Sequence, residues 1–424
     1  MKTTTSMFLA VFAVIFCINS TLSAQWVHSD WPDYPYMNVV SFAVSGQNLF
    51  AVDLSSGVGF LLWRSTNNGI NWTNVGSTNM GVEALAVSGT NPLSPKLFAG
   101  TPNGVFLSTN NGTSWTSTSI GLKNPDVISF AVSGTNLFAG VKNDGLDDGV
   151  FLSTNNGTSW NAANVGFPNY VDVLALAVSG TNLFAGVYGD GIYLSTNNGT
   201  NWQAVNSGLE GIRVSTLLVS GTNIFAGSEF EGVFLSTNNG TNWKAVNTGL
   251  TSTSVLAFAV YGTNLFVGTV DGGVFLSTNN GTSWKAVNTG LTSNHIKSLV
   301  VVGANTSTPM LFAGVYYDGV WKRPLSDFGI SSVSHVAPTN NSLSSFPNPF
   351  SQSTSIKFSS SDHGFVQVSI HNLLGSEVAR LFTGSLDAGE HVFSWDAQSM
   401  PPGMYVCVVR TNGRTEEMPI MLVK

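Results

Sequence analysis

The phrase Ser-Thr-Asn-Asn-Gly-x-x-Trp occurs six times in this chain, at a step of 41 to 45 residues. A fixed period in this range is typical of repeat architectures, in which each copy forms one unit that stacks on its neighbours. Six copies indicate a shared structural role, because a catalytic residue is usually needed once. The copies start at Ser65, Ser108, Ser153, Ser195, Ser236 and Ser277 and end at Trp72, Trp115, Trp160, Trp202, Trp243 and Trp284.

Each copy lies within a larger unit of four short apolar runs separated by turn residues. In the third unit the first three runs are residues 128–132, 136–140 and 149–152, and Trp160 begins the fourth. β-Branched and aromatic runs with Gly, Asn and Ser turns between them predict an antiparallel meander. Four strands in about 42 residues is the size of a propeller blade.

The count of units predicts how the ring closes. The last unit has a third strand at residues 319–322 but no fourth, because the chain continues into residues 323–325. Residues 25–27, Gln-Trp-Val, resemble the start of a fourth strand without the first three. We therefore expect an all-β, seven-bladed β-propeller whose N-terminal strand completes the last blade, which removes exposed sheet edges. The first strand of the unit recurs near Phe42, Leu85, Phe130, Leu176, Leu217, Phe258 and Leu299.

The repeated phrase resembles the Asp-box, Ser-x-Asp-x-Gly-x-x-Trp, of neuraminidase-like, sortilin-type, xyloglucanase and photosystem-II assembly factor-like propellers. Asn replaces the Asp in every copy, but both residues accept backbone N–H bonds in turns and tolerate a left-handed conformation. We expect the Trp to lie between blades. Calcium prefers charged oxygen ligands, so loss of the carboxylate disfavours a metal here, and we expect no cofactor. The Asn residues are Asn67, Asn110, Asn155, Asn197, Asn238 and Asn279.

The N-terminus has the features of a secretory signal peptide. Lys2 precedes an apolar run at residues 7–18, and small residues suited to cleavage end at Ala24. A membrane anchor is the alternative, but the run is short for a bilayer. Cys17 lies in this segment, so cleavage leaves Cys407 alone and no intrachain disulfide is expected. No transmembrane anchor is expected after cleavage.

Composition narrows the class of partner. Charged residues are only 9 % of the chain and the net charge is −7, which argues against nucleic acid, whose phosphates require a basic face. Hydrophobic residues are 43 %, which argues against disorder.

After a Ser-, Asn- and Pro-rich stretch, further alternating strands predict a small, immunoglobulin-like β-sandwich. It resembles the C-terminal sorting domain of the type IX (Por) secretion system, through Phe-Pro-Asn-Pro-Phe at 346–350, the segment 368–375 and Pro-Gly-Met-Tyr at 402–405. The resemblance implies export to the surface of a Bacteroidetes–Chlorobi-type bacterium, contact with the secretion machinery, outer-membrane attachment and removal of the domain. The sorting-motif residues are Pro347, Asn348, Pro349, Gly375 and Gly403.

The expected domain organisation is a signal peptide at residues 1–24, a propeller at 25–324, a linker at 325–345 and the sorting domain at 346–424.

We expect a ligand-binding site on the face of the propeller whose loops differ in sequence from one repeat to the next. Loops between second and third strands share one face with the inter-blade loops, and six of these seven loops carry acidic residues. They form either an acidic, ligand-facing rim or ordinary Asp-Gly turns. Neighbouring aromatic residues suit a carbohydrate or peptide ligand, or simply cover loop ends. The candidate ligand-binding residues are Asp144, Asp148, Asp190, Glu229, Asp271, Asp318, Tyr188, Tyr316 and Tyr317.

Enzymatic activity is the weaker interpretation. A sialidase needs an arginine cluster, and the propeller has only Arg64, Arg213 and Arg323, of which Arg64 adjoins a repeated turn and Arg323 the ring closure. A xyloglucanase-like glycosidase needs two carboxylates at a controlled separation, and no pair stands out. The histidines show no zinc-ligand spacing. We expect a binding or structural surface protein that recognises a glycan or protein; the alternative is a polysaccharide-active glycoside hydrolase that uses rim carboxylates.

Overall fold

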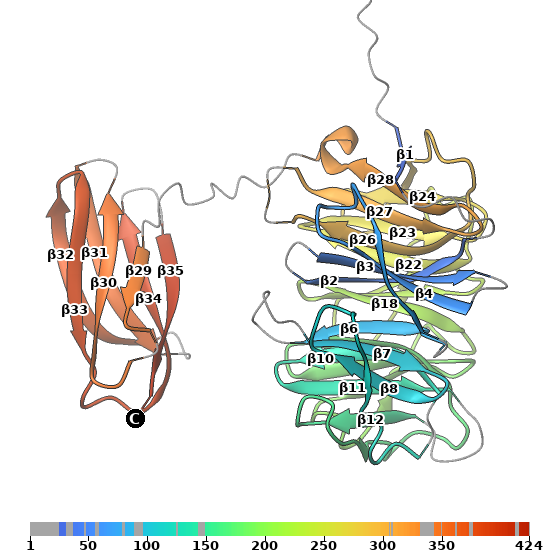
Figure 1. The fold of residues 1–424 in the computed structure, drawn as a ribbon, viewed down its shortest axis with the longest axis horizontal. Helices are drawn as coiled ribbons and strands as arrows, with labels where there is room; N and C mark the ends of the chain where they lie inside the picture. Colours follow the sequence, from blue (N-terminus) through green and yellow to red (C-terminus); the bar gives the residue numbers. More distant parts are fainter. Residues whose placement is uncertain are drawn as a thin grey trace, which may run out of the picture. The chain divides into compact units, whose positions relative to one another are not determined.

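A computed structural model of the chain describes residues 25–30, 37–45, 48–55, 59–78, 81–88, 96–123, 126–142, 149–304, 306, 308–330, 343–348, 350–360, 363–372, 376–411 and 415–423. The chain divides into two compact units at residues 333/334, and both are all-β (Figure 1). Among the residues described, no helix has the length and hydropathy needed to span a membrane.

The N-terminal unit contains seven four-stranded antiparallel sheets in the described part of the chain (Figure 1). Each sheet is one blade, numbered here in chain order. The strands are β2 (Val39–Ser45), β3 (Asn48–Ser55), β4 (Gly59–Ser65) and β5 (Thr73–Thr78) in blade 1; β6 (Ala84–Ser88), β7 (Lys96–Thr101), β8 (Gly104–Ser108) and β9 (Thr116–Ser117) in blade 2; β10 (Val127–Ser133), β11 (Asn136–Val141), β12 (Val150–Ser153) and β13 (Asn161–Ala162) in blade 3; β14 (Val173–Ser179), β15 (Asn182–Val187), β16 (Gly191–Ser195) and β17 (Gln203–Ala204) in blade 4; β18 (Val214–Ser220), β19 (Asn223–Ser228), β20 (Val233–Ser236) and β21 (Lys244–Ala245) in blade 5; β22 (Val255–Tyr261), β23 (Asn264–Thr269), β24 (Val274–Ser277) and β25 (Lys285–Ala286) in blade 6; and β26 (Ile296–Val302), β27 (Met310–Val315), β28 (Gly319–Pro324) and β1 (Val27–His28) in blade 7.

The blades form a closed ring around their first strands. β2, β6, β10, β14, β18, β22 and β26 each contact the next, and β26 contacts β2. Second strands such as β11 and β15 are buried along almost their whole length, because both faces of a blade pack on neighbouring blades. The prediction of a seven-bladed propeller is confirmed.

The ring closes where the sequence predicts. β1 pairs antiparallel with β28, with Val27 opposite Lys322 and His28 opposite Trp321. Trp26 is 1 % exposed, and its indole N–H donates to the carbonyl of Val287 in blade 6 at 2.7 Å. The first and last parts of the propeller are thus joined without a covalent bond.

A short 3-10 helix occupies the place of the missing seventh turn. η1 (Leu325–Phe328) follows β28 directly, and Leu325 is fully buried. The Phe328 ring lies 5.4 Å from Phe266 and 6.2 Å from Trp26 between ring centroids. Residues 325–330, which the sequence assigns to the linker, therefore pack on the propeller.

The repeated turn is held by side-chain hydrogen bonds. In the first copy the Ser65 hydroxyl accepts the N–H of Gly69 at 2.8 Å, and the side-chain oxygen of Asn67 accepts the N–H of Asn71 at 2.9 Å. The left-handed residue is the second Asn, Asn68 with φ 52°, and not the Asn that replaces the Asp. The first Asn acts as an acceptor, because its side-chain oxygen bonds the backbone two residues beyond the Gly.

The tryptophans join neighbouring blades, as the repeat predicts. Trp72 donates to the Ser29 hydroxyl, beside β1 of blade 7, at 2.8 Å. Trp115 differs, because its indole N–H bonds its own turn at Gly112 and its ring is only half-buried. The other four donate to a carbonyl of the preceding blade: Trp160 to Thr118 at 2.8 Å, Trp202 to Ala163 at 2.7 Å, Trp243 to Val205 at 2.8 Å and Trp284 to Val246 at 2.8 Å.

The C-terminal unit is a small β-sandwich, as predicted. One sheet has the order β29-β30-β33 and the other β32-β31-β34-β35. Trp395, Ile356 and Val368 lie in the core between them. The strands are β29 (Leu343–Phe346), β30 (Ser353–Ser360), β31 (Gly364–Asn372), β32 (Glu377–Leu386), β33 (Gly389–Asp396), β34 (Gly403–Thr411) and β35 (Thr415–Leu422).

Trp26→Ala is expected to lower the free energy of unfolding of the propeller by about 3–5 kcal/mol, the usual loss for a buried Trp. It removes the bond that closes the ring as well as the buried ring itself. Urea unfolding of the full chain, followed by tryptophan fluorescence, measures the loss. Trp115→Ala is the control, because its N–H stays within its own turn, and it should cost less. Equal losses would contradict a special role for Trp26.

Candidate functional site

One face of the propeller is built by the loops between second and third strands and by the inter-blade segments; we call it the variable-loop face. These two kinds of loop are tied together by backbone hydrogen bonds. The N–H of Tyr188 donates to Asp172 at 3.0 Å, Glu229 to Arg213 at 3.0 Å, and Tyr316 to His295 at 2.9 Å. The repeated turns lie at the opposite ends of the strands, so they form the opposite face.

Several rim acids hold the fold of their own loops. The Asp190 carboxylate accepts the Tyr193 hydroxyl at 2.8 Å, and burial together with this bond raises the pKa of Tyr193 to about 12. The Asp318 carboxylate accepts the Trp321 indole N–H at 3.1 Å and the Thr292 hydroxyl. Asp144 and Asp148 lie outside the described residues.

Two predicted rim residues, Tyr188 and Glu229, meet at an arginine. The Arg213 guanidinium lies 4.6 Å from the ring centroid of Tyr188 and 5.7 Å from that of Phe230. It also pairs with Glu229 at 3.5 Å, with both side chains partly exposed. Tyr188, Arg213, Glu229 and Phe230 form the Arg213 cluster, which spans blades 4 and 5. The sequence analysis considered Arg213 only as part of a sialidase arginine cluster and did not predict its contacts with Tyr188, Glu229 and Phe230. These loops come together because β14 and β18 lie side by side in the ring, which the sequence motifs do not state.

A second group lies on blade 7. The Tyr316 ring stacks on Tyr317 at 3.9 Å and lies 4.5 Å from the His295 ring. The Lys297 ammonium lies 5.2 Å from the Tyr316 ring centroid. His295, Lys297, Tyr316 and Tyr317 form the blade-7 cluster.

The two basic residues of the blade-7 cluster are poorly hydrated. Burial lowers the pKa of Lys297. Burial also lowers the pKa of His295, with the charge of Lys297 acting in the same direction and that of Asp271 opposing it. Asp271 is the predicted rim acid that the structure brings near this cluster.

Tyr317 adopts a backbone conformation that glycine has in another blade. Its φ is 58°, and the equivalent residue in the loop of blade 4 is Gly189, with φ 74°. A left-handed conformation costs an L-residue roughly 1–2 kcal/mol. Tyr170, also on the variable-loop face, has φ 66°. Such outliers in exposed loops are typical of functional positions.

The inner edge of the ring carries a charged residue at one position in blades 2 and 7, where four of the other blades have an aliphatic residue and blade 5 has Ser215. Most first strands have a bulge, which leaves one extra residue near the variable-loop face. Burial raises the pKa of Glu83, as does the charge of Asp126, while Lys142 opposes them. Aligning the repeats on the bulge would have found Glu83 and Lys297 from sequence. The bulge-position residues are Val40, Glu83, Ile128, Leu174, Ser215, Leu256 and Lys297, all half-buried.

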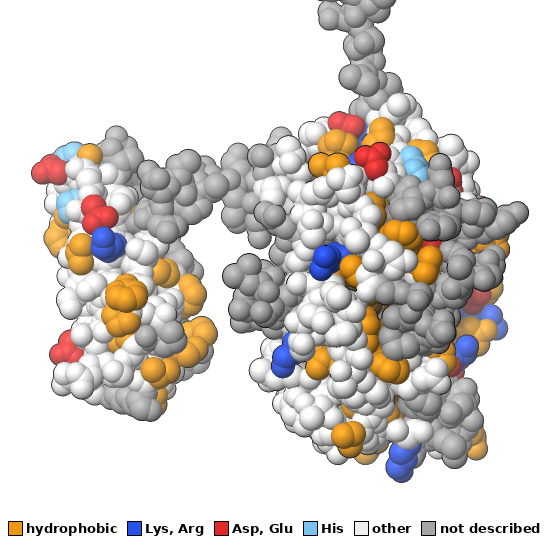
Figure 2. Space-filling model, in the orientation of Figure 1, with side chains coloured by type: hydrophobic (Ala, Val, Ile, Leu, Met, Phe, Trp, Pro, Cys, Tyr) orange, Lys and Arg blue, Asp and Glu red, His pale blue; other side chains and the backbone are white. Residues whose placement is uncertain are grey.

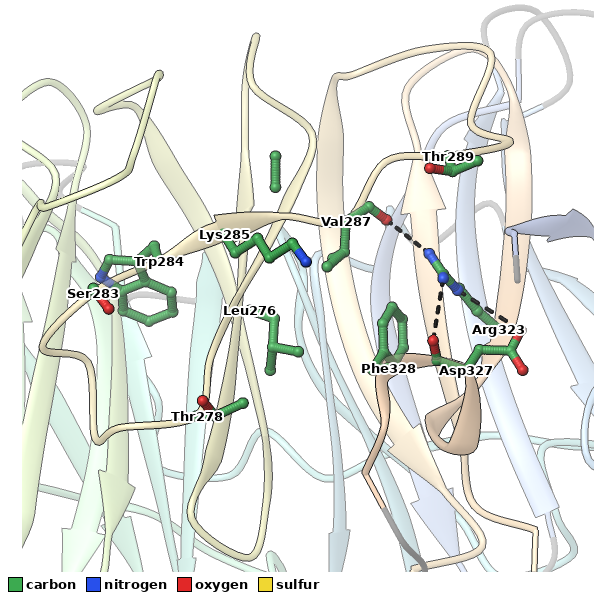
Figure 3. A pocket seen from close by; sticks show the side chains of 11 residues that line it. Leu276, Thr278, Ser283, Trp284, Lys285, Val287, Thr289, Arg323, Asp327 and Phe328 are labelled. Carbon is green, nitrogen blue, oxygen red and sulfur yellow. Dashed lines mark hydrogen bonds and ion pairs between the residues drawn. The ribbon is translucent and has the colours of Figure 1, made fainter. Parts of the chain in front are cut away.

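A cavity of about 410 Å³ lies at the outer seam between blades 6 and 7 (Figure 3). The Arg323 guanidinium donates to the carbonyl of Val287 at 3.2 Å, lies 4.3 Å from the Phe328 ring centroid and is 3.8 Å from the Asp327 carboxylate. Arg323 therefore contacts both blade 6 and the segment that follows blade 7, and so stabilises the closure of the ring.

The described parts of the two units hold no cluster suited to a metal. Within the described ranges, no three His, Cys, Asp or Glu side chains gather closely enough to hold an ion. Cys407 is fully buried, and burial raises the pKa of its thiol to about 12, which makes it a poor nucleophile. Figure 2 shows that charged side chains are sparse on the face in view.

The sorting-motif residues serve the fold of the C-terminal unit. The Asn348 side chain donates to the carbonyl of Pro419 at 3.0 Å and accepts the N–H of Met421 at 2.9 Å, which fastens the start of the unit to its last strand. The Pro347 carbonyl accepts the Thr354 hydroxyl, and Gly403, with φ 153°, begins β34. Pro349 and Gly375 lie outside the described residues.

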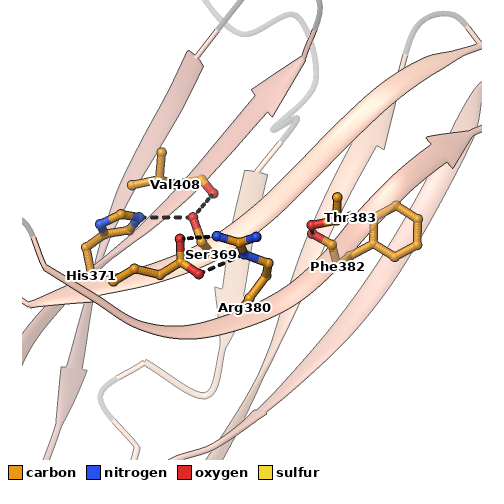
Figure 4. A network of polar contacts seen from close by, with 7 residues as sticks. Ser369, His371, Arg380, Phe382, Thr383 and Val408 are labelled. Carbon is orange, nitrogen blue, oxygen red and sulfur yellow. Dashed lines mark hydrogen bonds and ion pairs between the residues drawn. The ribbon is translucent and has the colours of Figure 1, made fainter.

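A polar network lies on the β31–β32–β34 sheet (Figure 4). The Ser369 hydroxyl bonds the His371 ring at 3.0 Å, and Arg380 forms two bonds to Glu377 at 2.8 and 2.9 Å. The Arg380 bonds lower the pKa of the Glu377 carboxyl.

Comparison with known proteins supports this division. Residues 344–422 match the family described as secretion system C-terminal sorting domain. PorZ, a surface component of the type-IX secretion system of Porphyromonas gingivalis, is similar in structure, with a TM-score of 0.54 at 16 % identity, over 91 % of this chain. The chain spans only 59 % of the length of that PorZ chain.

YCF48 propellers are also similar. YCF48 from Cyanidioschyzon merolae has a TM-score of 0.53 at 14 % identity, covering 71 % of this chain and 98 % of its own. YCF48 bound to D1 peptide has a TM-score of 0.53 at 13 % identity, covering 70 % and 94 %. At these identities the likeness shows the fold alone. The sorting domain indicates a secreted or cell-surface propeller protein that interacts with the type IX machinery of a Bacteroidetes-type bacterium.

Gly189→Tyr is expected to lower the free energy of unfolding by about 1–2 kcal/mol, the cost of a left-handed L-residue. A Cβ at Gly189 meets nothing within 4 Å, so the loss comes from the backbone alone. Urea unfolding of the full chain provides the measurement. In the reverse exchange, Tyr317→Gly, relief of strain should offset the lost ring stacking to within about 1 kcal/mol. A neutral Gly189→Tyr would show that this turn is unstrained.

Glu83→Gln is expected to stabilise the propeller at pH 7. Below pH 4.5, the ordinary pKa, glutamate is protonated in both folded and unfolded chains and the two proteins should match. As pH rises towards the raised pKa, the folded chain keeps a proton that the unfolded chain has released, so wild type loses stability relative to the variant. Urea unfolding at pH 4 and pH 7 measures the difference.

Glu210→Gln is the control with the opposite sign. Hydrogen bonds from the backbone N–H groups of Glu210 itself and of Gly208 lower the pKa of the Glu210 carboxyl. This variant should therefore be less stable than wild type at pH 7, with the difference vanishing in acid. The same sign for both variants would contradict the assigned causes.

Proposed function

We propose that this protein is a ligand-binding propeller of the bacterial surface, with its binding site on the variable-loop face and a glycan or protein as its ligand. The sorting domain supports surface display. We further propose that residues 1–24 are removed as a signal peptide and that the propeller, residues 25–324 with residues 325–330 packed on it, is the functional domain, followed by the sorting domain with its first strand at Leu343–Phe346.

The observation that carries this proposal is the set of exposed aromatic side chains on one face. Tyr170 is 67 % exposed, Tyr188 45 %, Phe230 56 % and Tyr317 51 %. Exposed apolar side chains grouped on one surface are typical of interaction sites. Tyr and Arg are also frequent among residues that dominate binding energy. The Arg213 cluster supplies flat rings, a guanidinium and a carboxylate, which suit the ring faces and hydroxyls of a sugar or the side chains of a peptide.

The similar propellers are consistent with a binding role. PorZ is described as a surface component, and one YCF48 structure holds a peptide. These are properties of those proteins, and they support by analogy a propeller that binds rather than reacts.

A second candidate function is hydrolysis of a polysaccharide. Glu83 favours it, because its carboxyl has a raised pKa and Asp126 is close enough to contribute. A glycosidase needs a protonated acid beside an ionised carboxylate. The rim acids Asp190 and Asp271 are the other carboxylates that such an enzyme would use.

Phe230→Ala is expected to weaken ligand binding about tenfold or more, the effect of losing a dominant aromatic contact. Binding of the full chain is measured on a glycan array and on a peptide array. Ile70→Ala is the matched control, since Ile70 is 52 % exposed but belongs to a repeated turn on the opposite face; it should bind as wild type does.

Two outcomes would count against the binding module. Equal losses in the Phe230 and Ile70 variants would remove the variable-loop face as the site. Hydrolysis of any polysaccharide in the same screen, lost in Glu83→Gln, would favour the second function.

A further inference from the structure

We propose that the blade-7 cluster binds the C-terminal carboxylate of a peptide, with Lys297 as its counter-ion and Tyr316 and Tyr317 as the wall against which the last side chain packs. This inference rests on the proposed binding role of the variable-loop face and names the ligand chemistry of one part of it.

Lys297 is the first step of the argument. It occupies the bulge position at the inner edge, where blades 4 and 6 have Leu174 and Leu256. A half-buried ammonium costs free energy that a leucine would not. The Lys297 ammonium makes a cation–π contact with the face of the Tyr316 ring, and no carboxylate of the described residues forms an ion pair with it. The position therefore carries an unneutralised positive charge at a cost to stability.

His295 adds a second polar group beside the same Tyr316 ring. Its Nε2 is buried and has no hydrogen-bond partner among the residues described. Its ring is fixed against Tyr316, and its pKa is lowered in part by Lys297. An anion that lies between the two would accept a charge-assisted hydrogen bond from Lys297 and another bond from the imidazole, and would satisfy both groups.

The tyrosines supply an aromatic surface beside the two basic groups. One face of the Tyr317 ring stacks on Tyr316, and the side chain is 51 % exposed to solvent. Tyr317 stands in a left-handed conformation that its counterpart Gly189 adopts without strain. The left-handed Tyr317 and the half-buried charge of Lys297 therefore lie on the same side chain, Tyr316, at two positions where other blades have a less destabilising residue.

The surrounding charges favour a single carboxylate over a polyanion. Asp271 lies close enough to His295 to affect its pKa, and the same face carries Asp190 and Glu229. An acidic polysaccharide would bring repeated negative charges against these carboxylates. A peptide C-terminus brings one carboxylate to the basic group, while its preceding residues can be neutral or basic over the rim. Capture of a terminal carboxylate is a known mode of peptide recognition.

The test uses the full chain and two peptide arrays of identical sequences, one with free C-terminal carboxylates and one with C-terminal amides. We expect binding to the free-acid array and a loss of about tenfold or more on the amide array or in Lys297→Leu, as for a charge-assisted bond. Leucine is the native residue at this position in blades 4 and 6, so this variant should fold.

Lys244→Leu is the matched control. It deletes the same charge on β21, an exposed outer strand, and should bind as wild type does. Equal binding to both arrays, or equal loss in the two lysine variants, would overturn the inference, as would binding to a uronate oligosaccharide on a glycan array that Lys297→Leu abolishes.

The outcomes separate this inference from the function on which it rests. Glycan or peptide binding that depends on Phe230 but not on Lys297 would leave the binding module standing and remove the carboxylate site. Absence of binding to any array would overturn both.

Discussion

The seam between blades is the constraint on which the structure depends. At most seams an indole N–H reaches across to a main-chain carbonyl of the preceding blade, as from Trp202 to Ala163 at 2.7 Å. The glycine of the turn lets the backbone approach the preceding blade: in the copy that ends at Trp160, a Cβ at Gly157, where φ is +80°, would lie 2.4 Å from the Phe98 ring. A buried N–H without an acceptor costs about 1–3 kcal/mol. Each indole therefore needs the carbonyl of the preceding blade, and its hydrogen bond holds the two blades together. The repeated phrase is constant because this contact is repeated.

A rigid ring of this kind leaves one face free to vary. The repeated turns occupy one set of strand ends, so differences between blades concentrate at the other. There, departures from the repeat that cost stability are the informative ones. Tyr317 takes the conformation of a glycine, and Lys297 and Glu83 place charge at a position where the other five blades have an uncharged residue. Natural proteins commonly accept such local costs at functional sites.

The fold can be predicted well from the sequence because aligning the repeats shows which residues occupy equivalent positions in each blade. The half-blade at Trp26 could be assigned to blade 7 by counting alone, and β1 does pair with β28. The candidate site is harder to predict. The Asp190 carboxylate accepts a hydrogen bond from Tyr193 of its own blade, and no sequence motif indicates that the Tyr193 side chain points towards it. The Arg213 cluster joins side chains from two blades, which no local motif predicts. The β-bulge at Lys297 inserts one residue into β26, so the strict alternation of a strand assigns the Lys297 side chain to the wrong face.

The closure also links the site to the ends of the chain. Until Trp26 reaches Val287, β28 presents an unpaired edge and blade 6 lacks its neighbour at the outer seam. An exposed edge is an aggregation hazard, and the contact that covers it joins residues 261 positions apart, which makes its loop-closure cost high. Blade 7 holds both this closure and the blade-7 cluster, and Asp318, which is bonded to Trp321, directly follows the stacked tyrosines Tyr316 and Tyr317. The closure and the proposed carboxylate site therefore share blade 7, and the loop between β27 and β28 links them along the chain.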